Sequence, residues 1–186
     1  MIGDSDMPAA LDFVPHYTIR DFSLWKGDWE LWEGTAIAMA PRPFGVHQRI
    51  VTRLSRAIGN AIEASACQAE VIVDLDWIIL EDTIVRPDIV VVCGLPPECY
   101  LEKSPSIVVE VLSESTRQND LNYKRQLYHR EGVAAYLMVD PEARSIQVDR
   151  RQSDGNYTTE ISVSEIAMRL CEDCEIRFHT LRIFSQ

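Results

Sequence analysis

The sequence lacks any apolar stretch of the roughly 18 to 20 residues that a membrane-spanning helix needs. It also lacks a basic start, because residues 1–12 include acids but no lysine or arginine, which does not fit a secretory signal. We therefore expect a cytoplasmic protein without a membrane anchor, with a flexible tail over residues 1–16.

Basic residues are scarce, since 18 lysines and arginines face 29 aspartates and glutamates, for a net charge of −11. This balance excludes a general nucleic-acid coat protein. One stretch departs from it, because no acid occurs between Glu33 and Glu63. Arg49, Arg53 and Arg56 lie there at a spacing that puts them on one helix face. That face is either a solvated surface or a stripe that contacts phosphates.

The chain has five cysteines, at positions 67, 93, 99, 171 and 174. An odd number without a secretory signal predicts reduced thiols in a cytoplasm. Cys171 and Cys174 form a lone C-x-x-C pair. A structural zinc site would need two more ligands, and no second pair has suitable spacing. We therefore interpret this pair as incidental.

The length of 186 residues and the ordinary composition predict one domain with a sizeable core. Hydrophobic periodicity predicts helices over 18–25, 46–64 and 116–131 and a helical turn over 164–168. It predicts strands within 28–39 (a hairpin), 70–80 (a pair), 84–92, 106–112, 133–140, 145–150, 157–161 and 176–183. This order indicates a mixed α+β or α/β fold centred on one sheet, with an N-terminal hairpin.

Two carboxylates lie at or within very apolar runs. Asp88 precedes Ile89-Val90-Val91-Val92, and Glu110 follows Ile107-Val108-Val109. Burying a carboxylate is costly unless another group pairs with it. A hard divalent cation such as Mg²⁺ prefers carboxylate oxygens and can pair with two of them at once.

A lysine follows these acids on the next predicted helix. Asp120, Lys124 and Tyr128 are four residues apart and so share one helix face. If that helix packs back on the Glu110 strand, Lys124 points towards Glu110. Two metal-binding carboxylates with a nearby ammonium suit the hydrolysis of a phosphodiester.

These residues resemble the PD-(D/E)xK nuclease superfamily and, within it, the Uma2 family of restriction-endonuclease-like proteins. The resemblance covers about residues 17–141. Its segments, in order, are Trp29-Glu30-Leu31-Trp32-Glu33-Gly34, His47, Val85-Arg86-Pro87-Asp88-Ile89, Val109-Glu110-Val111-Leu112-Ser113, Asp120 with Lys124 and Tyr128, and Gly132-Val133 through Tyr136-Leu137-Met138-Val139-Asp140-Pro141.

The resemblance implies a restriction-endonuclease-like core, with a central mixed sheet flanked by helices. It assigns the two metal-binding acids to Asp88 and Glu110. The superfamily's usual lysine position falls on Leu112, so Lys124 would take that role. Glu30 matches an upstream acid that completes the site.

The same resemblance implies a Mg²⁺- or Mn²⁺-dependent endonuclease that acts on DNA and pairs into a homodimer. His47, Arg49 and Arg53 would contact the substrate. Glu114 departs from the family pattern, which often has proline there. The alternative is a catalytically silent interaction protein that keeps the nuclease fold, and the acidic net charge favours it.

Overall fold

The computed structural model describes residues 14–39, 45–114, 116–162, 164–171 and 174–185. The elements in chain order are α1 (Ile19–Phe22), β1 (Trp29–Trp32), β2 (Thr35–Ala38), α2 (Gly45–Ala64), β3 (Ala69–Val73), β4 (Trp77–Leu80), β5 (Thr83–Val85), β6 (Ile89–Cys93), β7 (Ile107–Val111), α3 (Arg117–Asn119), the π-helical turn η1 (Asp120–Lys124), α4 (Arg125–Arg130), β8 (Ala135–Asp140), β9 (Ser145–Arg151), β10 (Tyr157–Ser162), β11 (Glu165–Leu170) and β12 (Cys174–His179). Most of the predicted tail, residues 1–13, lies outside the described residues.

The main sheet has six strands in the order β10-β9-β8-β7-β6-β3. Only β7 and β8 run parallel, and the other neighbours are antiparallel. A parallel pair needs a long crossover, and the helical segment α3–η1–α4 supplies it. The predicted mixed sheet with flanking helices is therefore confirmed.

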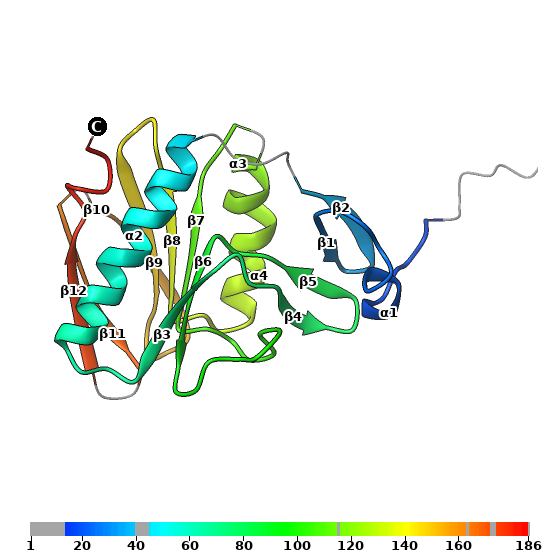
Figure 1. Cartoon of the computed structure of the whole chain (residues 1–186), viewed down its shortest axis with the longest axis horizontal. Helices are drawn as coiled ribbons and strands as arrows, with labels where there is room; N and C mark the ends of the chain where they lie inside the picture. Colours follow the sequence, from blue (N-terminus) through cyan, green and yellow to red (C-terminus); the bar gives the residue numbers. More distant parts are fainter. Residues whose placement is uncertain (1–13, 40–44, 115, 163, 172–173, 186) are drawn as a thin grey trace, which may run out of the picture.

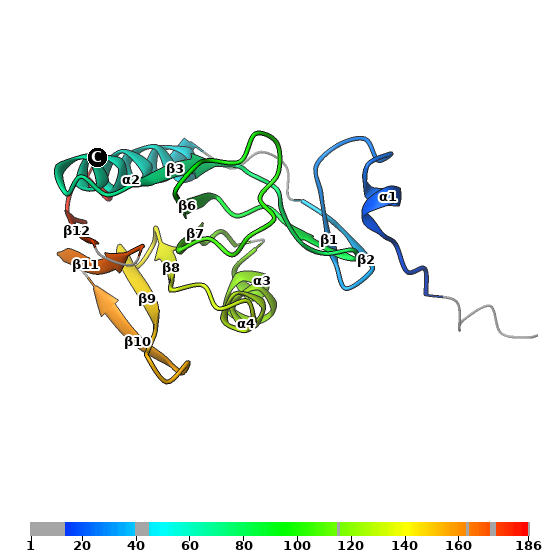
Figure 2. The same ribbon diagram turned by 90° about the horizontal axis from the view of Figure 1, so that it is seen from below.

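The two faces of this sheet are covered by different elements (Figure 2). One face packs against α2 and the β11–β12 ribbon, and the other packs against α4 and β4. Strand residues alternate between the faces: Val109 and Val111 belong to the first cluster, and Val108 and Leu112 to the second. Glu110 therefore projects towards α4.

Helix α2 confirms the amphipathic prediction, because Ile50, Leu54, Ile58 and Ile62 are all buried on its sheet-facing side. Burying one such side chain completely stabilises the fold by about 1.5–3 kcal/mol. No helix in the described part of the chain is long and apolar enough to cross a membrane.

A smaller four-stranded sheet, β2-β1-β5-β4, carries the predicted N-terminal hairpin at one end of the molecule (Figure 1). Glu33 and Gly34 form its turn, and both have positive φ angles. The predicted capping box of Thr18 and Asp21 begins α1.

Two element predictions were wrong. Strands β3 and β4 were expected to pair with each other, but the chain turns at Asp74, which has a positive φ angle, and β4 joins the smaller sheet. The helical turn over 164–168 is instead part of β11. Ile166, Met168 and Leu170 are buried at a spacing of two, which is the period of a strand.

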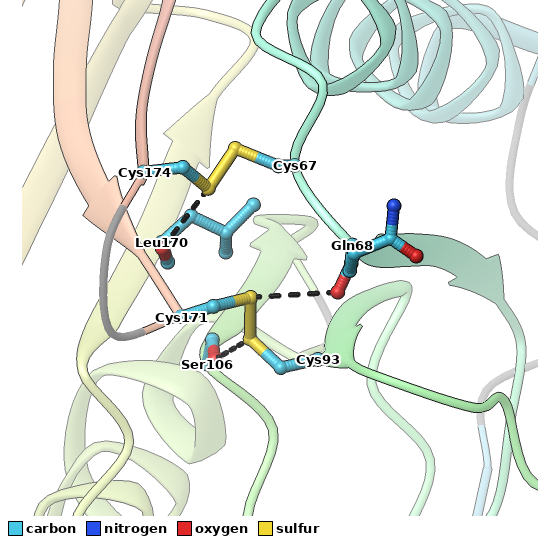
Figure 3. The surroundings of a disulfide bond; sticks show 7 residues. All are labelled: Cys67, Gln68, Cys93, Ser106, Leu170, Cys171 and Cys174. Atoms are coloured by element: carbon cyan, nitrogen blue, oxygen red, sulfur yellow. Dashed lines mark hydrogen bonds between the residues drawn. A yellow bond between two sulfur atoms is a disulfide. The ribbon is translucent and has the colours of Figure 1, made fainter.

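The expectation of reduced cysteines is also corrected. Disulfides join Cys67 to Cys174 and Cys93 to Cys171, so both members of the C-x-x-C pair are used, while Cys99 is free (Figure 3). The partners are 107 and 78 residues apart in sequence. Tertiary packing brings them together, with the β11–β12 ribbon against α2, so their spacing in the sequence carried no signal.

Candidate active site

Lys124 is the centre of a buried polar cluster between the two sheets. Its Nζ atom lies 3.0 Å from Glu110 Oε1 and 2.9 Å from Glu30 Oε1. Glu110 comes from the middle of the main sheet, Glu30 from β1 of the smaller sheet, and Lys124 from η1. Three predicted site residues that are distant in sequence are thus in direct contact.

The helix that carries Lys124 has an irregular turn at this residue. The segment Asp120–Lys124 forms a π-helical turn within the α3–α4 helix, a feature frequent at functional sites. Lys124 is only 6% exposed, and one turn later the Tyr128 hydroxyl donates a hydrogen bond of 2.8 Å to Glu110 Oε1. Asp120, Lys124 and Tyr128 all turn towards the sheet, which confirms their predicted common face.

Glu30 is fixed by hydrogen bonds from its own neighbourhood. Its Oε1 atom accepts a bond of 2.8 Å from the backbone N–H of Arg86, and its Oε2 atom accepts one of 3.0 Å from the Trp32 indole. Because Arg86 lies two residues before Asp88, Glu30 ties the smaller sheet to the entrance of β6.

Asp88 lies beside the strand of Glu110. Its Oδ2 atom accepts a hydrogen bond of 2.7 Å from the backbone N–H of Val111 and lies 3.2 Å from His47 Nε2. His47 stands in the first turn of α2, so that helix contributes directly to the site. Asp88 thereby joins α2, β6 and β7 at one point.

The charges in this cluster perturb one another. Burial disfavours the ammonium of Lys124, but the carboxylates of Glu110, Glu30 and Asp120 outweigh it and raise the pKa of Lys124 well above its ordinary value. Burial also raises the pKa of Glu110, against the opposing charge of Lys124. Burial lowers the pKa of His47, but its hydrogen bond to Asp88, together with the charges of Asp88, Asp74 and Asp120, outweighs burial, so the net pKa of His47 is raised.

Carboxylates outnumber cations here. Glu30, Asp88, Glu110 and Asp120 repel one another across the cluster, and among the described residues Lys124 and His47 are the basic side chains paired with them. An excess of buried negative charge is relieved either by protonation or by a bound cation.

One oxygen each of Asp88 and Glu110 could hold a divalent cation. Among the described residues, the contacts of Asp88 use Oδ2 and those of Glu110 use Oε1, which leaves Asp88 Oδ1 and Glu110 Oε2 for a ligand. The described part of the chain contains no group of three or more His, Cys, Asp or Glu side chains arranged to hold a metal. A two-carboxylate site matches Mg²⁺, which keeps several of its waters.

The comparisons with known proteins give the family and the fold. Residues 20–173 match the Uma2 family, which is described as "Putative restriction endonuclease". The chain belongs to the Uma2 family.

A solved structure has the same fold. It is the crystal structure of "a putative nuclease belonging to DUF820" from Anabaena variabilis ATCC 29413, with a TM-score of 0.64 and 22% sequence identity. The match covers 78% of this chain and 83% of that chain. No curated protein matches the chain.

Leu112 is the position to which the resemblance assigns the lysine of the wider superfamily. At the expected position, Leu112 is buried in the apolar cluster under α4, whereas the Lys124 ammonium reaches Glu110 from the helix. The ammonium group that contacts Glu110 therefore comes from η1 and not from the strand that carries Glu110.

The predicted arginine stripe is only partly free. Arg49 and Arg56 are exposed on α2, but Arg53 Nη1 contacts the backbone carbonyls of Ile183 and Ser185. Arg53 therefore holds the C-terminal segment against α2. Arg49 is two residues from His47, so the two side chains point to opposite sides of α2, and the structure does not bring Arg49 to the site.

Asp120 is a site residue that the predicted set did not include. It is 2% exposed, and its Oδ1 atom has no hydrogen-bond partner while lying 3.8 Å from Lys124 Nζ. The four-residue spacing to Lys124 was the available signal. Tyr128 both stacks on Trp77 and donates a hydrogen bond to Glu110.

Asp120 makes the stability of the metal-free Uma2 protein depend on pH. Burial raises the pKa of Asp120 to about 6 from 3.8, so between these values the folded state binds the proton and the unfolded state does not. Stability relative to Asp120→Asn should therefore fall as pH rises from about 4 to 7, by about 1–3 kcal/mol. Urea unfolding in chelator measures this, with exposed Glu98→Gln as a control; a pH-independent difference would contradict it.

Proposed function

We propose that this protein is a metal-dependent endonuclease that hydrolyses phosphodiester bonds, with DNA as its substrate. The observation that carries the proposal is the buried Lys124 ammonium held between Glu30 and Glu110. Asp88 is hydrogen-bonded to the peptide group that follows Glu110. Membership of a nuclease-like family supports the same reaction class.

Asp88 and Glu110 would hold Mg²⁺ or Mn²⁺ through the oxygens that protein contacts leave open. When bound, the metal would polarise a phosphoryl oxygen and lower the pKa of water. Lys124, kept charged by its carboxylate neighbours, would donate a hydrogen bond to the attacking water or to the oxygen on which charge develops.

The surrounding residues keep these groups in position. Glu30 and Tyr128 fix the Lys124–Glu110 pair, and His47 orients Asp88 from the start of α2. Positioning of this kind contributes to rate because it removes the entropy cost of assembling the reacting groups. His47 would face a substrate phosphate from the first turn of α2, whereas Arg49 points to the opposite side of that helix.

The direct test is a cleavage assay on supercoiled plasmid, single-stranded DNA and RNA, with Mg²⁺, with Mn²⁺ and with chelator. We expect metal-dependent cleavage of DNA that Glu110→Gln abolishes and Glu98→Gln, a surface substitution, leaves unchanged. Cleavage of RNA but not of DNA would agree with the proposed active site but would contradict DNA as the substrate. Binding without cleavage under every condition would favour the catalytically silent alternative.

We also propose that the protein forms a homodimer with twofold symmetry. Strand β10 pairs only with β9 and stands at the edge of the main sheet, where Ile161 is 70% exposed. An uncovered edge of this kind is a ready surface for pairing. Light scattering at micromolar concentration should give twice the 21.2 kDa of one chain, and Ile161→Lys should lower it; a mass of one chain would contradict this proposal.

A further inference from the structure

Two disulfides attach the β11–β12 ribbon to the rest of the protein, one at Cys67 between α2 and β3 and one at Cys93 at the end of β6 (Figure 3). Cys67 is only 9% exposed, and its bond to Cys174 joins the buried cluster beneath α2. Cys93, at the end of β6, is exposed. Solvent therefore reaches the Cys93–Cys171 bond at Cys93, while the Cys67–Cys174 bond is shielded at Cys67.

An oxygen atom lies close to each sulfur of the Cys93–Cys171 bond. Cys171 Sγ lies 3.6 Å from the Gln68 carbonyl oxygen, and Cys93 Sγ lies 3.0 Å from Ser106 Oγ. A disulfide sulfur has no hydrogen to donate, so these are close contacts in the oxidised protein. In the reduced protein the same oxygens would accept hydrogen bonds from the two thiols. Cys174 Sγ likewise lies 3.1 Å from the Leu170 carbonyl oxygen, so the exposure of Cys93, and not these contacts, distinguishes the two bonds.

We propose that Cys93–Cys171 is a reversible thiol–disulfide exchange site for a dithiol reductant, and that Cys67–Cys174 is a structural bond. A thiolate of the reductant attacks the exposed Cys93 sulfur, forms a mixed disulfide and releases Cys171, which takes up a proton. The second thiol of the reductant then attacks the mixed disulfide and releases Cys93. Two electrons pass from the dithiol, which becomes a disulfide, to the protein, which gains two thiols.

Exposed disulfides are the labile or regulatory ones, whereas shielded structural disulfides resist reduction. The bond that exchanges holds Cys171, next to the end of β11, to the end of β6, while apolar packing and the shielded bond keep β11 and β12 in place. Reduction would therefore loosen the ribbon near Cys171 without unfolding the protein.

The experiment is differential alkylation of the native full-length protein in a graded series of dithiothreitol, followed by mass spectrometry. We expect Cys93 and Cys171 to become alkylated at least about 10-fold faster than Cys67 and Cys174, because access controls exchange. Equal rates for the four cysteines would overturn the proposal. So would four thiols in the unreduced protein with one bound zinc ion per chain, which would identify a metal site instead.

A variant distinguishes exchange from general loss of structure. The double substitution Cys93→Ser/Cys171→Ser should lower the melting temperature by roughly 5–15 °C, the scale of losing one long-range disulfide. It should also abolish the increase in hydrogen exchange of β11 and β12 that dithiothreitol causes in the wild type. Cys99→Ser, which removes the exposed free thiol, is the control. An undiminished response in the double variant would overturn the proposal, and none of these readouts depends on nuclease activity.

Discussion

Replacing Lys124 by methionine is expected to lower the rate of nucleic-acid cleavage by about 10²-fold or more, the scale of losing one acid–base or electrostatic group. The ammonium contacts both Glu30 and Glu110, so no other described cation can take its place at this point. Single-turnover cleavage at saturating Mg²⁺ measures the effect on the chemical step. Lys103→Met, on the surface, is the matched control.

The same substitution should also destabilise the protein, and this effect must be measured separately. Removing one partner from a buried ion pair leaves its carboxylates uncompensated and costs about 3–5 kcal/mol. In the double variant Glu110→Gln/Lys124→Met, one of these carboxylates is neutral, so part of the stability should return while cleavage stays low. If Lys124→Met folds normally and cleaves at the wild-type rate, Lys124 has no part in the reaction.

Asp88→Asn is expected to weaken the binding of Mg²⁺ or Mn²⁺. Loss of a residue that only supports a metal ligand typically costs roughly 10–100-fold in affinity, and loss of the ligand itself should cost more. An asparagine oxygen can still accept the Val111 N–H bond, so the contact between β6 and β7 should remain. Only the charge and the open carboxylate oxygen are lost. Isothermal titration calorimetry with Mn²⁺ measures the affinity directly.

A structural readout accompanies this variant. The hydrogen bond to Asp88 holds the pKa of His47 up against its burial, so Asp88→Asn should lower the pKa of His47, which NMR titration reports. Asp154→Asn, in an exposed turn, is the control. Unchanged metal affinity together with a lowered His47 pKa would show that Asp88 orients His47 but binds no metal.

The central contacts of the site could be predicted because a charged residue within an apolar run is easily recognised in the sequence. An acid inside a run of valines, as at Glu110, is costly without a partner, and the helix that directly follows the strand could supply one. The spacing of Asp120, Lys124 and Tyr128 then predicted which side of that helix faces the sheet. The amphipathic pattern of α2 was equally direct.

The long-range features had no such local signal. Nothing near Glu30 indicates that β1 would stand opposite β5 and place this acid on Lys124, and only the family resemblance pointed to it. The disulfides were missed for the same reason, since their partners come from β6, the end of α2 and the C-terminal ribbon. The division of β3 and β4 between two sheets depends on a single backbone angle at Asp74.

The central claim is that Asp88 and Glu110 bind one divalent cation next to Lys124. The most direct measurement is an anomalous difference map from crystals soaked with Mn²⁺ at a concentration that supports cleavage. The account predicts one peak at roughly 2.0–2.6 Å, the range for hard-cation oxygen ligands, from an Asp88 oxygen and a Glu110 oxygen, absent in Asp88→Asn crystals. A map with no peak there, or with Mn²⁺ bound only at other residues, would contradict it.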